Sequence, residues 1–191
     1  MNPPPPIPGA VIARAIAEDG GAIPDGHMLV SLHERPDLDR AIGQHTMPVW
    51  PPFMLEDPVA GRLWDRLHQE LAPFQLLLLG PDGAIVGSGN SAPLAWDGTD
   101  AGLPHGWDDQ FERSVADLDA GRPMDTLGAL QIVVDPRRQG EGLSALMVRA
   151  FRAHARLRGH RALIACVRPT LKERYPLTPI ERYAAWTRPD G

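Results

Sequence analysis

Residues 133–145 read VVDPRRQGEGLSA and join an apolar run to an amphipathic segment. Gly140 and Gly142 lie between the two, immediately before the amphipathic pattern begins. A glycine-rich turn that opens a helix presents backbone N–H groups at the positive end of the helix dipole, where phosphate binds. The stretch therefore predicts a phosphate-binding loop, but it leaves open which phosphate-bearing molecule the loop holds.

The segments on either side of this loop predict a strand, a helix and a second strand. Residues 127–134 are almost continuously apolar, which indicates a strand buried on both faces. Apolar residues at helical spacing indicate a helix from Leu143 to Leu157 that Gly159 closes. Residues 162–167, ALIACV, indicate the following strand. This order is a βαβ unit, whose two strands should be parallel neighbours or near neighbours.

Further elements are predicted upstream of the loop. Residues 27–32 alternate as a strand does, and residues 58–71 carry apolar side chains at helical spacing behind an Asp57-Pro58 start. Two apolar runs flank the turn at residues 80–83 and predict a β-hairpin. Residues 108–120 predict a short helix, and the Pro-rich stretch after Thr46 and residues 93–107 are interpreted mainly as loops.

The composition narrows the classes of protein to which this chain can belong. The chain has 191 residues, 43% of them hydrophobic and 23% charged, as expected for one globular domain. Its formal net charge of −5 disfavours a nucleic-acid binder, and no apolar run has the length of a membrane helix. One cysteine and an N-terminus without a signal-peptide pattern favour a reducing compartment. We therefore expect a cytoplasmic protein with no nucleic-acid or membrane partner, and the histidines and acids show no metal-ligand spacing.

Read from Gly140, the loop spells G-x-G-x-x-A, which is a dinucleotide fingerprint. That motif needs its first glycine at the end of the strand and an acidic residue after the next strand. Here residues 135–139 intervene, and the next strand runs into Val167-Arg168-Pro169 without an acid. These departures weaken the interpretation as a nicotinamide-dependent oxidoreductase, which is kept as an alternative.

Read from Val134, the loop spells V-x-P and then Gln139-x-x-Gly142-x-Ser144. This pattern resembles motif A of the GCN5-related N-acetyltransferases, the GNAT superfamily, with Ser144 where glycine or alanine is usual. The stretches GNSAPLAWDGT and GLSALMVRAFRAHA are also similar to a bacterial group of GNAT-like proteins. The resemblance implies an α/β fold with a mixed β-sheet flanked by helices, and it implies that the family's C-terminal helix and strands are missing from this chain.

The resemblance also implies a binding site for acetyl-CoA as co-substrate, with no metal. In it, backbone N–H groups of the loop would hold the pyrophosphate, and main-chain groups at the end of the preceding strand would pair with the pantetheine and polarise the thioester. The residues so implied are Gln139, Gly140, Glu141, Gly142, Leu143 and Ser144 in the loop, and Ile132, Val133 and Val134 in the strand. The amine acceptor, a small molecule or a peptide, would attack the thioester directly.

A catalytic base is not identified by the sequence. Asp97 and His105 lie in the long loop after the hairpin, and the imidazole has a suitable intrinsic pKa. Tyr183 is a candidate for the tyrosine acid that the family often carries on its C-terminal helix. For each of these residues the alternative is an exposed or packed side chain without a catalytic role. Further candidates weighed on the same grounds are Glu56, Asp108 and Tyr175.

The sequence divides into three parts on this interpretation. Residues 1–22 form a disordered or extended Pro-rich N-terminus, residues 23–168 a GNAT-like acyl-CoA-binding domain, and residues 169–191 a Pro-rich C-terminal segment. The expected function is N-acetyl transfer, and the alternative from another class is a non-catalytic acyl-CoA-binding or interaction domain. An incomplete sheet edge would invite pairing with a second copy, as a homodimer.

Overall fold

The computed structural model describes residues 5–50, 52–167 and 171–187. Its centre is a five-stranded sheet in the order β1-β2-β3-β4-β5. The strands are β1 (Met28–Ser31), β2 (Leu76–Leu79), β3 (Ile85–Leu94), β4 (Thr126–Val134) and β5 (Ala162–Ala165). Neighbouring strands are antiparallel except β4 and β5, which are parallel. The mixed sheet and the parallel β4–β5 pair are confirmed. A doubly wound parallel sheet, which the nicotinamide alternative requires, is contradicted.

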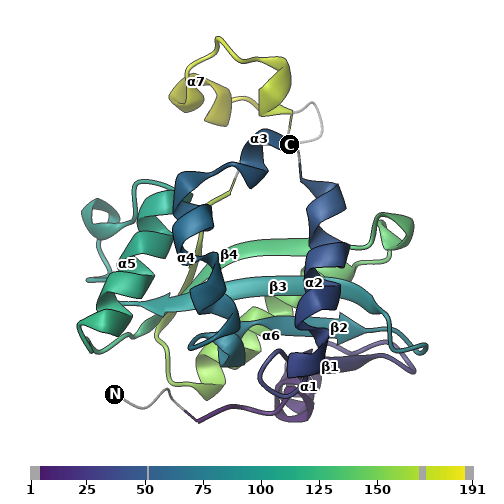
Figure 1. The fold of residues 1–191 in the computed structure, drawn as a ribbon. Coiled ribbons are helices and arrows are strands. Elements are labelled where there is room, and N and C mark those ends of the chain that lie inside the picture. The colour runs from purple at the N-terminus through teal and green to yellow at the C-terminus, as the bar shows by residue number, and fades with distance from the viewer. Residues whose placement is uncertain (1–4, 51, 168–170, 188–191) are drawn as a thin grey trace.

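Helices cover both faces of the sheet (Figure 1). On one face, α6 (Leu143–Leu157) packs against β3 and β4, and α1 (Gly9–Glu18) packs against α6. On the other face lie α2 (Asp39–Thr46), α4 (Pro58–His68) and α5 (Trp107–Asp119). β2 is buried throughout, and Leu77 and Leu79 pack with Ile42 of α2. The core therefore lies in two layers, one on each side of the sheet.

The N-terminal segment differs from its prediction as a disordered or extended stretch. Residues 9–18 form α1, in which Ile12 and Ile16 are 0% and 1% exposed. The helix starts against β1: a Cβ added to Gly9 would lie 2.0 Å from the carbonyl oxygen of Leu29, so only glycine fits there. The proline tract ends at Pro8, and the apolar spacing behind it is helical. Residues 1–4 lie outside the described residues.

The Pro-rich stretch after Thr46 differs from its prediction as mainly loop, because it contains a 3-10 turn at Met47–Val49 and the short helix α3 (Pro52–Leu55). The helix α2 precedes it, in residues for which the sequence predicts no element. In α2, the chain buries only Ile42 and Thr46, so the apolar periodicity that reveals a helix is weak. The neighbouring helix α4 is confirmed, and its Asp57 side chain accepts hydrogen bonds from the N–H groups of Val59 and Ala60, at 2.9 and 2.8 Å.

The chain after β5 contains little regular structure. Among described residues 171–187, a 3-10 turn at Lys172–Arg174 and the short helix α7 (Ile180–Ala184) are present, and no strand follows β5. The rings of Tyr175, Tyr183 and Trp186 pack together, with centroids 5.0–5.6 Å apart. This segment stands off the sheet at the top of Figure 1. The predicted Pro-rich segment 169–191 otherwise falls partly outside the described residues.

A basic cluster is buried at the C-terminal end of α6. His154 is 0% exposed and accepts a hydrogen bond from Nε of Arg158 at 2.7 Å. The Arg158 guanidinium stacks 4.3 Å from the centre of the Phe74 ring, and His160 lies on the same ring, 6.3 Å between centroids. Burial, with the charges of Arg158 and His160, lowers the pKa of His154 to about 3. His154 is therefore neutral in the folded protein.

We expect acid to destabilise the fold through His154. Below pH about 6.5 the unfolded chain takes up a proton on this imidazole, while the folded protein does so only near pH 3. The free energy of unfolding should therefore fall by about 1.4 kcal/mol per pH unit from this group as the pH drops through that window. Urea denaturation at pH 7, 6 and 5 measures the slope. A His154→Gln variant, which retains a hydrogen-bond acceptor, should have a shallower slope; equal slopes in the two proteins contradict the prediction.

Candidate functional site

The loop between β4 and α6 has the geometry of an anion cradle. Residues 136–138 form a 3-10 turn, and the Asp135 carboxylate accepts a hydrogen bond from the N–H of Arg137 at 2.9 Å. Gly140 and Gly142 then take φ angles of 86° and 78°. These left-handed conformations favour glycine, and they turn the chain directly into α6. The predicted loop-to-helix turn is therefore present.

The backbone N–H groups of this turn are available to a ligand. Within the described part of the chain, the N–H groups of residues 139–145 make no hydrogen bond, and the first helical bond runs from Leu146 N to Gly142 O at 3.0 Å. No side chain caps the N-terminus of α6. Free donors at the positive end of a 15-residue helix attract phosphate by hydrogen bonding and by the helix dipole together.

A cavity of about 300 Å³ lies beside these donors. Its walls come from the end of β4, the loop, the first turn of α6 and one residue before α3. The residues are Val49, Ile132, Val133, Val134, Arg138, Gln139, Gly140, Gly142, Leu143 and Ser144. Of the loop and strand residues predicted from the sequence, only Glu141 does not line the cavity. The structure thus brings the others together, while their role in binding CoA stays a prediction.

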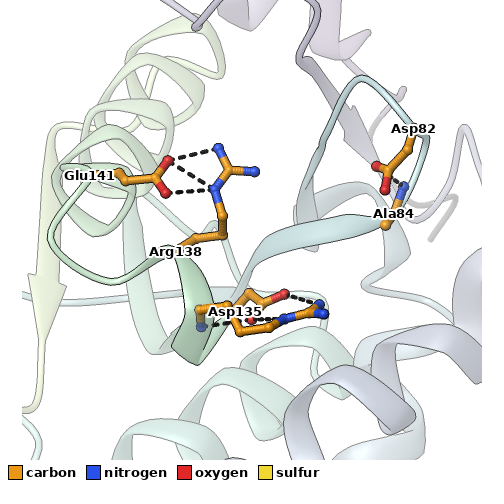
Figure 2. Close-up of polar contacts among 6 residues, drawn as sticks. Asp82, Ala84, Asp135, Arg138 and Glu141 are labelled. Carbon is orange, nitrogen blue, oxygen red and sulfur yellow. Dashed lines mark hydrogen bonds and ion pairs between the residues drawn. The ribbon is translucent and has the colours of Figure 1, made fainter.

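The charged side chains of the loop are paired with one another. Arg138 donates from Nε to both carboxylate oxygens of Glu141, at 2.7 and 2.8 Å (Figure 2). Arg137 pairs with Asp135 at 2.7 Å, and this guanidinium holds the pKa of Asp135 down to about 2. Asp135 therefore remains ionised and keeps its hydrogen bond to the turn. Because both arginines are balanced by acids, the free N–H groups supply the main attraction for an anion.

The edge of β4 is open next to the cavity. β5 pairs only with residues 126–129 of β4, whereas β3 pairs with β4 up to Val134. Where β5 ends, side chains of α5 take the carbonyls of β4: Gln110 donates to Ala129 at 2.9 Å and Trp107 to Leu130 at 2.8 Å. The edge at residues 131–134 then faces no strand. An extended ligand can pair with it as another strand would.

His45 and Val49 are residues of this site that the sequence did not reveal. His45 lies on α2, makes a polar contact with the main chain of Val133, and its buried Nε2 atom has no partner within the described residues. Burial lowers the pKa of His45, so the imidazole is predominantly neutral near pH 7. Both residues fall in the stretch for which the sequence predicts loop or gives no helical signal.

The three candidate catalytic residues lie apart from the cavity lining. Asp97 follows β3, whose last residue pairs with Thr126 at the end of β4 opposite the loop. Its carboxylate accepts hydrogen bonds from the N–H and hydroxyl of Thr99, which lower its pKa and form a local turn. His105 lies before α5, and Tyr183 lies in the aromatic cluster of α7. The structure therefore does not bring these three together, and a catalytic role for them remains untested.

No helix in residues 5–50, 52–167 or 171–187 is long and apolar enough to cross a membrane. The same ranges contain no group of three or more His, Cys, Asp or Glu side chains placed to hold a metal ion.

The chain is similar in sequence to one curated enzyme. No family model matches the chain. The arginine N-acetyltransferase avaD of Aspergillus versicolor is 30% identical over 189 residues, which cover 90% of this chain and 64% of that protein. The chain thus spans less than two thirds of the length of this curated relative.

Solved structures share the fold at low sequence identity. The loading GNATL domain of CurA from Lyngbya majuscula matches with a TM-score of 0.59 and 16% identity, over 86% of this chain and 76% of that domain. A GNAT family acetyltransferase from Brucella melitensis, in complex with acetyl-CoA, matches with a TM-score of 0.52 and 20% identity, over 80% and 83% of the two chains.

The mixed sheet, the open edge of β4 and the glycine loop at the start of α6 define the fold of this α/β protein. The chain has the fold of the GNAT proteins whose solved structures it matches. The helix α5, which lies between β3 and β4, supplies the two side chains that cover the carbonyls of Ala129 and Leu130.

Proposed function

We propose that this protein transfers an acetyl group from acetyl-CoA to an amine acceptor. One observation carries the proposal: residues 139, 140 and 142–144, whose N–H groups are free, and the open β4 edge border the same cavity. Pyrophosphate suits the first feature, and the extended amide chain of pantetheine suits the second. The acetyl-CoA complex of the Brucella melitensis relative in fold supports this choice of ligand.

Different segments of the cavity wall bind different parts of acetyl-CoA. The loop from Gln139 to Ser144 binds the pyrophosphate through main-chain N–H groups, so their side chains are loosely constrained. The main chain of residues 132–134 binds the pantetheine, and one of its N–H groups stabilises negative charge that develops on the thioester oxygen. Because backbone groups do this work, no protein nucleophile is needed. The acceptor amine attacks the carbonyl carbon directly.

Asp108 is the carboxylate that we propose as the base; it is exposed and lies outside the cavity lining. It directly follows Trp107, whose ring N–H holds the carbonyl of Leu130. Partial desolvation, together with the carboxylates of Asp57 and Glu112, raises the pKa of Asp108. A carboxylate with a raised pKa accepts a proton more readily near neutral pH. The same negative charges favour a cationic acceptor, in agreement with the arginine N-acetyltransferase named among the relatives.

The proposal is tested by incubating the protein with acetyl-CoA and a panel of amines. L-Arginine comes first, followed by other amino acids, a polyamine and a peptide with a free N-terminus. Release of the CoA thiol gives the rate, and mass spectrometry of the acceptor identifies the acetylated nitrogen. We expect CoA release that depends on the amine. If acetyl-CoA binds but no amine accelerates CoA release, the non-catalytic acyl-CoA-binding alternative replaces the proposal.

A further inference from the structure

Three side-chain amides form a hydrogen-bonded chain across the sheet, from Gln75 through Asn90 to Gln131. Gln75 and Asn90 are 1% and 2% exposed, and Gln131 is half-buried. The Asn90 amide nitrogen donates to Gln75 Oε1 at 3.0 Å, and the Gln131 amide nitrogen donates to Asn90 Oδ1 at 2.8 Å. Asn90 and Gln131 are direct partners in the β3–β4 register. We call these three residues the amide chain.

The direction of the amide chain is determined at its buried end. Gln75 Nε2 donates to two main-chain carbonyls, those of Leu71 at 2.7 Å and Ser91 at 3.0 Å. A flipped Gln75 amide would place its oxygen against both carbonyls, so its Oε1 must face Asn90. Asn90 must then present its nitrogen to Gln75 and its oxygen to Gln131. The Gln131 nitrogen is thereby committed to Asn90.

This arrangement leaves one hydrogen-bond acceptor at the end of the chain. No hydrogen bond to Gln131 Oε1 is present among the described residues. Gln131 lies directly after Leu130, where β5 has ended and the open edge of β4 begins. Gln131 does not itself line the cavity, but it directly precedes Ile132, the first strand residue that does. The amide chain therefore holds the free oxygen in a fixed orientation one residue from the main-chain groups to which we assign the pantetheine and the thioester.

Burying three amides at these positions costs more free energy than burying apolar side chains of similar size would. The neighbours of the amide chain two residues along β2 and β4, on the same face, are the buried apolar side chains of Leu77 and Val133. Buried amides must all be satisfied to avoid a desolvation penalty, and an apolar core at these positions would avoid that requirement. Orientation of a polar group toward a ligand is a functional gain that explains this cost.

We propose that the Gln131 amide oxygen accepts a hydrogen bond from the acceptor amine and so orients its nitrogen toward the thioester. The inference rests on the proposed function and adds an acceptor-binding residue to it; Asn90 and Gln75 act as positioning residues. In the step, the nitrogen bonds to the carbonyl carbon and the carbon–sulfur bond breaks. A cationic amine first gives one proton to the base. As the amide forms, the nitrogen loses a second proton and the thiolate gains one, so the reaction releases one proton to solvent. Gln131 accepts a hydrogen bond and removes no proton.

Steady-state kinetics of a Gln131→Leu variant test the inference, with L-arginine or the best amine of the panel as acceptor. One lost hydrogen bond should raise KM for the amine about tenfold, while KM for acetyl-CoA stays within about twofold. Gln69→Leu makes the same substitution at an exposed position at the end of α4 and should match the wild type. Equal KM values for the amine in Gln131→Leu and the wild type overturn the inference.

A double-mutant cycle separates positioning from a merely structural role. Asn90→Ala should also raise KM for the amine, and adding it to Gln131→Leu should raise KM no further, because Asn90 acts through Gln131. Effects of the two substitutions that multiply contradict this coupling. Gln131→Met is the second variant if Gln131→Leu fails to fold, as judged by urea denaturation. A wild type that acetylates no amine overturns the proposed function itself, whereas an active wild type with an unaffected Gln131 variant overturns only this inference.

Discussion

A Phe151→Ala variant should lose about 3–5 kcal/mol of its free energy of unfolding. Phe151 is 1% exposed on α6, and its ring fills the space that a side chain at Gly89 would occupy. A Cβ added to Gly89 would lie 2.6 Å from Cζ of this ring. Removing the ring leaves a cavity between helix and sheet that the bare glycine strand cannot fill. The loss is large because the surroundings cannot collapse around it.

Urea denaturation measures this loss, and Val148→Ala on the same helix is the matched control. Val148 is 44% exposed, so its truncation should change the free energy of unfolding by no more than about 0.5 kcal/mol. A Phe151→Ala loss below about 1 kcal/mol would show that the helix does not pack on the glycines of β3 as described.

A Gly142→Val variant should bind acetyl-CoA about 100-fold more weakly than the wild type. Gly142 has a φ of 78°, which a β-branched residue adopts only under strain. Relief of that strain rotates the adjacent peptide groups and turns their N–H donors away from the phosphate. Loss of one or two hydrogen bonds to a charged group accounts for an effect of this size. Isothermal titration calorimetry gives the affinity.

Gly159→Val is a control with the same backbone strain. Gly159 has a φ of 75° at the other end of α6, and, as at Gly142, no atom lies within 4 Å of an added Cβ. Both variants should lose similar free energy of unfolding, but only Gly142→Val should lose affinity. If both bind acetyl-CoA equally well, the N–H groups around Gly142 do not hold its phosphates.

The parts of the fold that the sequence predicted are those with strong local signals. The helix from Leu143 to Leu157 has a long apolar stripe closed by Gly159, and the hairpin has a turn of Gly, Pro and Asp between apolar runs. The parallel pairing of β4 and β5 follows from the helix between them. In contrast, α1 and α2 were missed because proline composition dominated the first and only two inward residues mark the second.

In the candidate site, too, the sequence predicted residues that are contiguous and missed those that only the fold brings together. The loop from Gln139 to Ser144 is contiguous in sequence, so its motif predicts both its structure and its ligand class. The amide chain joins Gln75, Asn90 and Gln131, which only the strand register brings together. His45 reaches the site from α2, a helix that the sequence did not reveal. Local patterns therefore predict the loop that we assign to phosphate, whereas the residues that we propose for the acceptor come together only in the tertiary structure.

A calorimetric titration of the wild-type protein with acetyl-CoA, beside the same titration with NADPH, tests the central claim most directly. Both ligands carry a pyrophosphate, but only acetyl-CoA has a pantetheine arm that can pair with the open edge of β4. The structure predicts saturable binding of acetyl-CoA and much weaker binding of NADPH. No binding of acetyl-CoA, or tighter binding of NADPH, would contradict the assignment of the loop and the strand edge to acyl-CoA.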